Sequence, residues 1–199
     1  GARHLTRRLT PLHSSVGPVV EMAGRQILLL ASNDYLGLAN HPEVVQSAIE
    51  ATQHFGAGAG ASRLISGSLP PHQELESALA QFKGTEAALT FSSGYLANIG
   101  TIPALVEQGG LILADRLCHA SLIDGCRLSA ADFRVYRHND TDHLRSLLAK
   151  NRRTRRTLIV TDGLFSMDGD LAPLPELCRL ANDYGADLYV DDAHGTGVM

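Results

Sequence analysis

The chain has 199 residues, a formal net charge of −4, and 44% hydrophobic and 19% charged residues. This length and mixed composition indicate a globular chain that can bury a core. A slightly acidic chain has no general attraction for nucleic acid or an anionic membrane, and no apolar run approaches the roughly 20 residues of a membrane span. The arginine-bearing start also lacks the apolar centre of a signal peptide, so we expect neither nucleic acid nor membrane as a partner.

The three cysteines, Cys118, Cys126 and Cys178, are odd in number and show no C-x-x-C spacing. This pattern indicates neither a disulfide framework nor a zinc site. We therefore expect a reducing, cytoplasmic setting and no metal centre.

Residues 1–40 are predicted to form an arm and a small-domain segment with one edge strand at 27–31. Asn40 is expected to cap a helix that contains Pro42 near its start and stops at Gly56. The glycine-rich stretch 56–67 follows. No strong strand precedes it, so we interpret it as a flexible or partner-facing loop, not a dinucleotide site.

Strands and helices alternate along the rest of the chain. This alternation indicates an α/β fold made of βαβ units, with a mainly parallel sheet and helices on both faces. Residues 41–199 are assigned to one larger domain. The predicted helices are 71–82, 94–106, 120–128, 142–150 and 175–184, and the predicted strands are 87–91, 111–114, 133–137, 157–161 and 188–191.

The last predicted strand, interpreted as buried, leads into a turn that carries Asp191, Asp192 and His194. A parallel sheet places its ligands just outside the carboxyl ends of its strands. A carboxylate there can hold a proton on a heteroaromatic nitrogen, and a nearby imidazole can hydrogen-bond a ring oxygen, a pair that suits pyridoxal phosphate (PLP). Magnesium sites, ribose sites and solvated turns use similar residues, so this turn alone leaves the alternatives open.

Three other stretches follow predicted strands. Residues 92–95 (S-S-G-Y) precede a helix whose free N–H groups can bind an anion, although an ordinary helix cap fits as well. His119 could stack on an aromatic ring, ligate a metal or cap the next helix. The polar loop 161–170 lacks the spacing of an EF-hand. Together at one sheet edge, these groups fit a phosphorylated aromatic cofactor better than a metal.

Seven motifs, in order from about residue 30, carry a resemblance to a known family. They are S-N-D-Y-L-G-L, G-A-S-R-L-I-S-G, F-S-S-G-Y-L-A-N, D-R-L-C-H-A-S-L-I-D-G, H-N-D, F-S-M-D-G-D-L-A-P-L and V-D-D-A-H-G-T-G-V. The chain resembles the α-oxoamine synthases, PLP-dependent enzymes of fold type I. The resemblance implies that residues 41–199 are the amino-terminal portion of the large PLP-binding domain.

The resemblance also implies roles for the residues that would hold PLP. Gly94 and Tyr95 would bind its phosphate through their backbone N–H groups. His119 would stack on the pyridine ring, and Asp191 would pair with the ring nitrogen. His119 and Asp191 are therefore catalytic candidates.

Four further residues take roles from the same resemblance. Ser166 and His194 would hydrogen-bond near the ring oxygen, with His194 a third catalytic candidate. Asn33, together with His119, would contact the amino-acid substrate, and Arg7 would contact the acyl thioester. Two positions depart from the family: Asp162 stands where a glutamate is usual, and Cys118 stands at a variable or asparagine position.

The implied activity is a decarboxylating condensation of L-alanine with pimeloyl-CoA or pimeloyl-ACP, in biotin biosynthesis, by a homodimer. The D-R-L-x-H-A-S-L motif favours this branch over glycine-using relatives that make aminoketobutyrate or aminolevulinate. Family members are roughly twice as long, and their PLP-binding lysine lies beyond the last motif. These 199 residues contain only Lys83 and Lys150, so they are expected to be inactive alone, and a lysine-lacking partner subunit is the second hypothesis.

Overall fold

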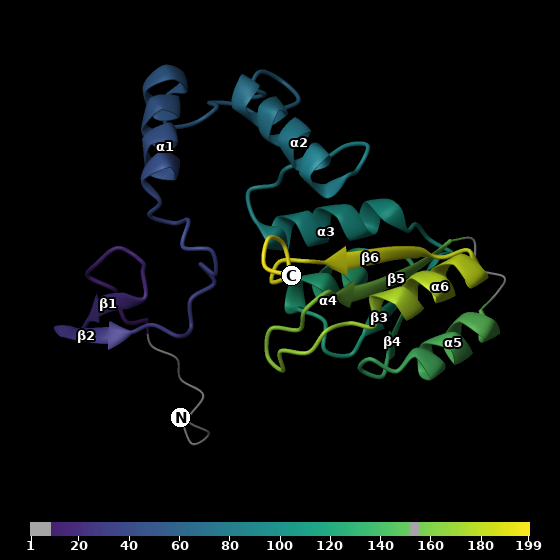
Figure 1. Ribbon diagram of the computed structural model, residues 1–199. Coiled ribbons are helices and arrows are strands. Elements are labelled where there is room, and N and C mark those ends of the chain that lie inside the picture. Colours follow the sequence, from purple (N-terminus) through teal and green to yellow (C-terminus); the bar gives the residue numbers. More distant parts are fainter. Residues whose placement is uncertain (1–8, 152–155) are drawn as a thin grey trace. The chain divides into compact units, whose positions relative to one another are not determined.

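The computed structural model describes residues 9–151 and 156–199 (Figure 1). The chain divides into two compact units, one reaching to Gly84 and the other running from Thr85 to Gly197. Each unit has its own secondary structure. The domain boundary expected at residue 40 stays a prediction.

The first unit begins with a β-hairpin made of β1 (Val19–Met22) and β2 (Arg25–Leu28), which pair in antiparallel fashion. The backbone between them has positive φ at Ala23 (52°) and Gly24 (71°), as a two-residue hairpin turn requires. The edge strand predicted at 27–31 is therefore wrong in its bounds, and β1 was missed. The turn was not predicted because Ala23, at its first position, is not a residue type that favours a tight turn.

Two helices complete the first unit, α1 (Pro42–Phe55) and α2 (Pro70–Lys83). The α1 prediction is confirmed, but its N-cap is His41, and no side chain caps that end. Asn40 was expected to be the cap; its side-chain amide instead donates to the carbonyl oxygen of Val16. The helix tolerates this loss because proline at its first position has no N–H group to satisfy.

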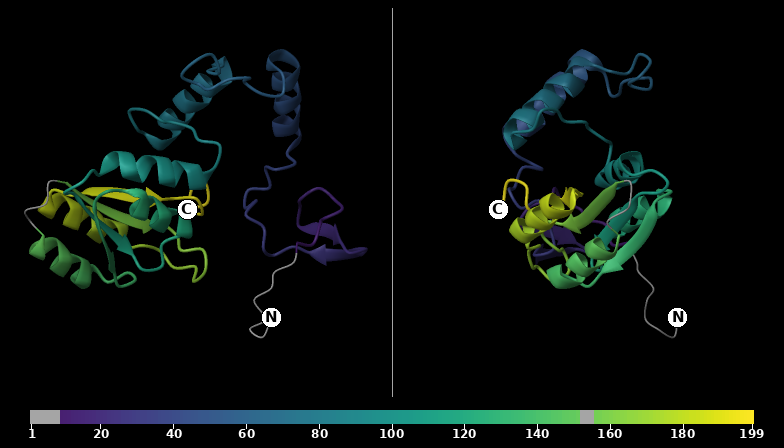
Figure 2. Two further views of the ribbon diagram at one scale, coloured as in Figure 1. Left: turned by 180° about the vertical axis from the view of Figure 1, so that it is seen from behind. Right: turned by 90° about the vertical axis from the view of Figure 1, so that its right-hand side faces the viewer.

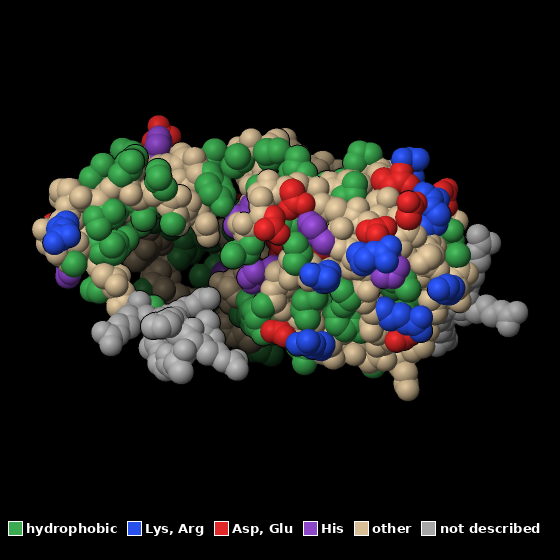
Figure 3. Space-filling model, turned by 90° about the horizontal axis from the view of Figure 1, so that it is seen from below, with side chains coloured by type: hydrophobic (Ala, Val, Ile, Leu, Met, Phe, Trp, Pro, Cys, Tyr) green, Lys and Arg blue, Asp and Glu red, His purple; other side chains and the backbone are tan. Residues whose placement is uncertain are grey.

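The apolar faces of α1 and α2 remain at the surface of the first unit. Neither helix has a buried residue among those described. A shallow apolar pocket on α1 is lined by residues that include Val44, Val45 and Ile49. Hydrophobic side chains are correspondingly visible on the molecular surface in Figure 3.

The second unit contains a four-stranded parallel sheet in the order β4-β3-β5-β6. The mainly parallel sheet predicted from the alternating pattern is confirmed. Its strands are β3 (Leu111–Asp115), β4 (Asp132–Tyr136), β5 (Thr157–Asp162) and β6 (Asp187–Asp191).

Helices cover both faces of this sheet, as predicted (Figures 1 and 2). Leu111 and Leu113 of β3 pack in one buried cluster with leucines of the last two helices of the second unit. Ile112 and Ala114 pack in a second cluster with residues of the first two helices of the same unit. This alternation is the period of two that a strand buried on both faces requires. The helices are α3 (Gly94–Leu105), α4 (Ala120–Leu128), α5 (Thr141–Lys150) and α6 (Leu174–Tyr184).

The strand predicted at 87–91 does not form, because no strand among the described residues pairs with it. Leu89 and Phe91 are exposed. A β-prone sequence adopts a ladder only when a partner supplies the hydrogen bonds. The prediction that the last strand is buried is also wrong: β6 is at an edge of the sheet, and its residues are exposed or half-buried.

The first two helices of the second unit approach each other closely because α4 contains Gly125. A Cβ atom at that position would lie 2.8 Å from the carbonyl oxygen of Asn98 and 3.1 Å from Ile102 Cδ1, both on α3. Any larger residue would therefore push the helices apart. This close contact sets the spacing of the polar residues described next.

Candidate active site

Polar residues from several elements meet at the carboxyl edge of the parallel sheet. β5 and β6 end side by side, with Asp162 and Asp191 as register partners. The loop after β3 leads through His119 into α4, and α3 begins nearby at Gly94. This is the edge at which the sequence predicted a site.

The Asp191 carboxylate is held by two hydrogen-bond donors. Asn98 Nδ2 donates to Asp191 Oδ2 over 2.8 Å, and the N–H of Ala193 donates to Asp191 Oδ1 over 3.1 Å. Asn98 lies four residues after Gly94, one turn along the same helix face. The end of β6 and the start of α3 therefore belong to one site.

The start of α3 offers free hydrogen-bond donors. The Ser93 hydroxyl accepts from the N–H of Leu96 over 3.2 Å, so the helix cap that the sequence left open as an alternative is present. The first N–H groups of a helix have no acceptor inside it, and within the described residues nothing accepts from those of Gly94 and Tyr95. A Cβ atom on Gly94 would meet open space. These donors and the helix dipole suit a phosphate group.

His119 caps α4, which was one of the three interpretations left open by the sequence. Its Nδ1 accepts from the N–H of Ser121 (3.3 Å) and lies 2.7 Å from the Ser121 hydroxyl oxygen. Its backbone N–H donates to Asp162 Oδ2 over 2.9 Å. The imidazole is thus attached to both α4 and the end of β5, and it remains exposed.

Two carboxylates, Asp162 and Asp191, share this edge of the sheet. Burial is the largest cause that raises the pKa of Asp162; the hydrogen bond from the His119 N–H lowers it, the charge of Asp191 raises it, and the net pKa is raised. A cationic ring nitrogen would relieve the repulsion between Asp162 and Asp191. Together with the free N–H groups of α3, this donor set fits a phosphorylated ring with a protonated nitrogen.

The remaining predicted site residues are His194, Ser166, Asn33 and Arg7. His194 is half-buried near Asp162, where its charge lowers the pKa of that carboxyl. Ser166 is exposed in the loop after β5. Asn33 lies in the first unit and accepts from the Tyr35 hydroxyl over 3.4 Å. Arg7 lies outside the described residues.

The sequence reasoning missed three residues that join the predicted ones. Asn98, Ser121 and Tyr189 form hydrogen bonds with one another or with Asp191 and His119. Asn98 and Ser121 fall inside motifs that were recognised, but no role was assigned to them. The helical spacing of Asn98 from Gly94 was the available signal.

A second polar network lies at the ends of β3 and β4. Asp115 is fully buried; its Oδ1 lies 2.9 Å from His138 Nδ1, and its Oδ2 accepts from the N–H of Asn139 over 2.8 Å. His138 Nε2 lies 2.7 Å from Asp170 Oδ2, and the ring packs edge-on against Phe165. Both ring nitrogens therefore face carboxylates, and the protonated ring satisfies both. Burial lowers the pKa of His138, but the hydrogen bonds and charges of the two carboxylates raise it, and the net pKa is raised.

This raised pKa predicts a pH-dependent stability. A group whose pKa is higher in the folded than in the unfolded state contributes its full stabilisation of the fold at pH values below its unfolded pKa, here about 6.5. That contribution is lost as the pH rises through the folded pKa. In the complete polypeptide, we expect His138→Gln to lower the free energy of unfolding by roughly 1–3 kcal/mol at pH 5.5 and by less at pH 9. Urea denaturation at both pH values measures the difference.

The matched control is His54→Gln, which changes an exposed histidine in the last turn of α1. We expect this variant to differ little from the unchanged protein at either pH. An equal loss of stability at both pH values for His138→Gln would show that the ring acts by packing and not by charge.

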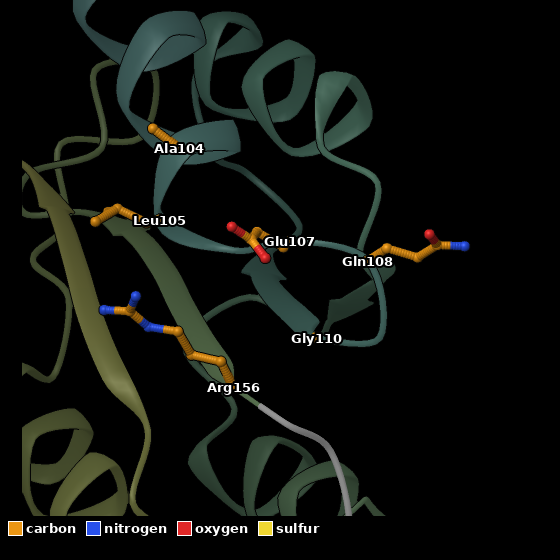
Figure 4. A pocket seen from close by; sticks show the side chains of 6 residues that line it. All are labelled: Ala104, Leu105, Glu107, Gln108, Gly110 and Arg156. Atoms are coloured by element: carbon orange, nitrogen blue, oxygen red, sulfur yellow. The ribbon is translucent and has the colours of Figure 1, made fainter.

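A pocket of about 330 Å³ lies away from this site (Figure 4). Gly110 precedes β3 and Arg156 precedes β5, so the pocket is at the amino ends of the strands. Arg156 is engaged there by Asp187, whose Oδ2 accepts from its Nε over 2.7 Å.

Within residues 9–151 and 156–199 no cluster of three or more His, Cys, Asp or Glu side chains is arranged to hold a metal ion. No helix there is both long and apolar enough to cross a bilayer. The three cysteines are free; Cys118 and Cys126 are buried, and burial raises the pKa of Cys126 to about 12.

Solved structures of known proteins share this fold. A serine palmitoyltransferase from S. paucimobilis, solved with bound PLP–myriocin, superimposes with a TM-score of 0.88 at 34% identity, over 92% of this chain and 46% of that one. An 8-amino-7-oxononanoate synthase from Francisella tularensis superimposes with a TM-score of 0.66 at 27% identity, over 80% of this chain and 43% of that one. The fold and the site define an α/β protein of the PLP-dependent fold type I class.

The chain belongs to the aminotransferase class I and II family, whose model matches residues 25–199. The 8-amino-7-oxononanoate synthase of Geobacter sulfurreducens is 57% identical over 195 residues, which are 98% of this chain and 50% of that protein. The enzyme of the same name from Thermoanaerobacter pseudethanolicus is 52% identical over 194 residues, 97% of this chain and 49% of that protein. The chain thus spans about half the length of the curated relatives it matches, and the resemblance read from the motifs is confirmed.

Proposed function

We propose that this chain is the amino-terminal part of a PLP-dependent acyltransferase that condenses L-alanine with a pimeloyl thioester to give 8-amino-7-oxononanoate and CO2 in biotin biosynthesis. The observation that carries the proposal is the single network joining Asp191, Asn98 and His119 beside the free N–H groups of α3. The relatives named for this reaction share more than half of their aligned residues with the chain.

The residues of the network would bind PLP in a defined orientation. The N–H groups of Gly94 and Tyr95 would hold the phosphate, and Asp191 would keep the ring nitrogen protonated. His119 would lie against the ring face. When bound, PLP withdraws electrons from the α-carbon of the amino acid.

Other residues would serve the substrates and complete the site. Ser166 and His194 would hydrogen-bond near the ring oxygen, Asn33 would contact the carboxylate of L-alanine, and Arg7 would contact pimeloyl-CoA or pimeloyl-ACP. The complete enzyme would be a cytoplasmic homodimer. Neither Lys83, the last residue of α2, nor Lys150, the last residue of α5, stands where the family resemblance places the PLP-binding lysine, which follows the V-D-D-A-H-G-T-G-V motif.

Product analysis of the complete polypeptide with PLP tests this proposal. Alanine or glycine is combined with pimeloyl, acetyl or succinyl thioester, and the products are identified by mass spectrometry. We expect 8-amino-7-oxononanoate from alanine and the pimeloyl thioester. Preferential use of glycine with an acetyl or succinyl thioester would assign the chain to a glycine-using relative. No turnover with any pair would favour the partner-subunit hypothesis, which the presence of only two lysines motivates.

A further inference from the structure

A chain of hydrogen bonds has Asn98 at its centre. This residue is buried, with 4% of its surface exposed. Its Nδ2 donates to Asp191 Oδ2 and to Ser121 Oγ, each over 2.8 Å, and its Oδ1 accepts from the Tyr189 hydroxyl over 2.8 Å. Because a carboxylate only accepts hydrogen bonds, the NH2 group must face Asp191, and the orientation of the amide is fixed.

This orientation determines where the proton of the Ser121 hydroxyl goes. Ser121 Oγ accepts from Asn98, so its one proton is free to point toward His119 Nδ1, 2.7 Å away. The backbone N–H of Ser121 points at the same nitrogen over 3.3 Å. Two donors facing Nδ1 require an unshared electron pair there, so the ring proton of His119 is on Nε2.

Packing prevents the chain from rearranging. Ser121 is 1% exposed, and Gly125 lies one turn further along the same face of α4. At Gly125 the two helices approach so closely that a Cβ atom would lie 2.8 Å from the carbonyl oxygen of Asn98. A water molecule between Asn98 and Ser121 has no room, because their side chains are already in direct contact.

We propose that Asn98 is a positioning residue which, through Ser121, holds His119 as the neutral Nε2–H tautomer, so that this imidazole meets a bound ligand as a hydrogen-bond donor. The inference rests on the proposed function only for the identity of that ligand. Nε2 can donate to a ligand oxygen, and it cannot accept a proton. A neutral imidazole also avoids charge repulsion against a protonated ring.

The test reads the tautomer directly, in the complete polypeptide without PLP or substrate. Long-range ¹H–¹⁵N correlation spectra distinguish Nδ1–H from Nε2–H imidazole, and His119→Gln identifies the signal. We expect the Nε2–H tautomer in the unchanged protein. In Asn98→Asp the carboxylate accepts from the Ser121 hydroxyl, so Nδ1 keeps only the longer contact with the Ser121 backbone N–H, and its hydroxyl neighbour can accept a hydrogen bond from it. We therefore expect the dominant tautomer to change from Nε2–H to Nδ1–H.

The matched control is Asn139→Asp. Asn139 Nδ2 also donates to a carboxylate, Asp170 Oδ2, over 2.8 Å, so the same substitution adds the same charge in a similar contact. We expect this control to leave the His119 signals unchanged. An Nδ1–H tautomer in the unchanged protein overturns the inference even if Asn98→Asp fails to fold, and so does an unchanged tautomer in a folded Asn98→Asp variant.

The measurement of the His119 tautomer and the product analysis test the two proposals independently. If the complete polypeptide makes no 8-amino-7-oxononanoate while His119 carries its proton on Nε2, the proposed function fails and the inference stands. If the product forms while the proton is on Nδ1, only the inference fails.

Discussion

Asp191→Asn is expected to lower the rate of the proposed condensation by about a thousandfold or more. The carboxylate of Asp191 can keep a ring nitrogen protonated, whereas a neutral amide cannot supply that charge. Both carboxylate oxygens already accept hydrogen bonds, from Asn98 and from Ala193. In the asparagine variant the NH2 group must face one of these donors, so the amide is also poorly satisfied.

The measurement is kcat of the complete polypeptide at saturating substrates and PLP, with cofactor occupancy determined by absorption. The matched control is Asp187→Asn, at the other end of the same strand, where the carboxylate is half-exposed and pairs with Arg156. We expect that control to retain nearly full activity. Near-full activity of Asp191→Asn would show that another group is the partner of the ring nitrogen.

The fold of the second unit followed from the sequence because local patterns and tertiary packing agree there. β3 and β5 have apolar centres and are buried along their whole length, with helices on both faces. The alternation of strands and helices therefore gave a parallel sheet directly. The strand predicted at 87–91 failed for the opposite reason, since a ladder depends on a partner that no local pattern reveals.

The sequence predicted which residue types lie at this edge of the sheet, but it did not predict the hydrogen bonds between them. Asp191 and His119 were identified because each follows a strand of a parallel sheet, where ligands bind. The contact between Asn98 and Ser121 depends instead on how closely α3 and α4 pack, which Gly125 permits. The His138 network likewise joins residues that are distant in the chain, since Asp115 and Asp170 each lie over 20 positions from His138. Contacts of this kind follow from the fold and not from the spacing of residues in the chain.

Gly94→Pro is expected to weaken PLP binding by about 10- to 100-fold while leaving the helix intact. Proline is favoured at the first position of a helix, and α1 and α2 both begin with one. The preceding residue must be extended, and Ser93 already is, with φ −160° and ψ 157°. The substitution therefore removes one N–H donor from the proposed phosphate site and fills the open space beside it without disturbing α3.

The dissociation constant of PLP, measured by equilibrium dialysis of the complete polypeptide, tests this expectation, and circular dichroism checks that the helix content is unchanged. The matched control is Gly94→Ala, which adds a methyl group but keeps the N–H; it should bind more tightly than the proline variant. Both variants have a Cβ atom, and proline in addition replaces the amide hydrogen with a ring carbon, so the gap between their dissociation constants measures the loss of this donor position. Equal constants would mean that the N–H of Gly94 does not hold the phosphate, and the donors would then have to be sought at Tyr95 or in another loop at this edge of the sheet.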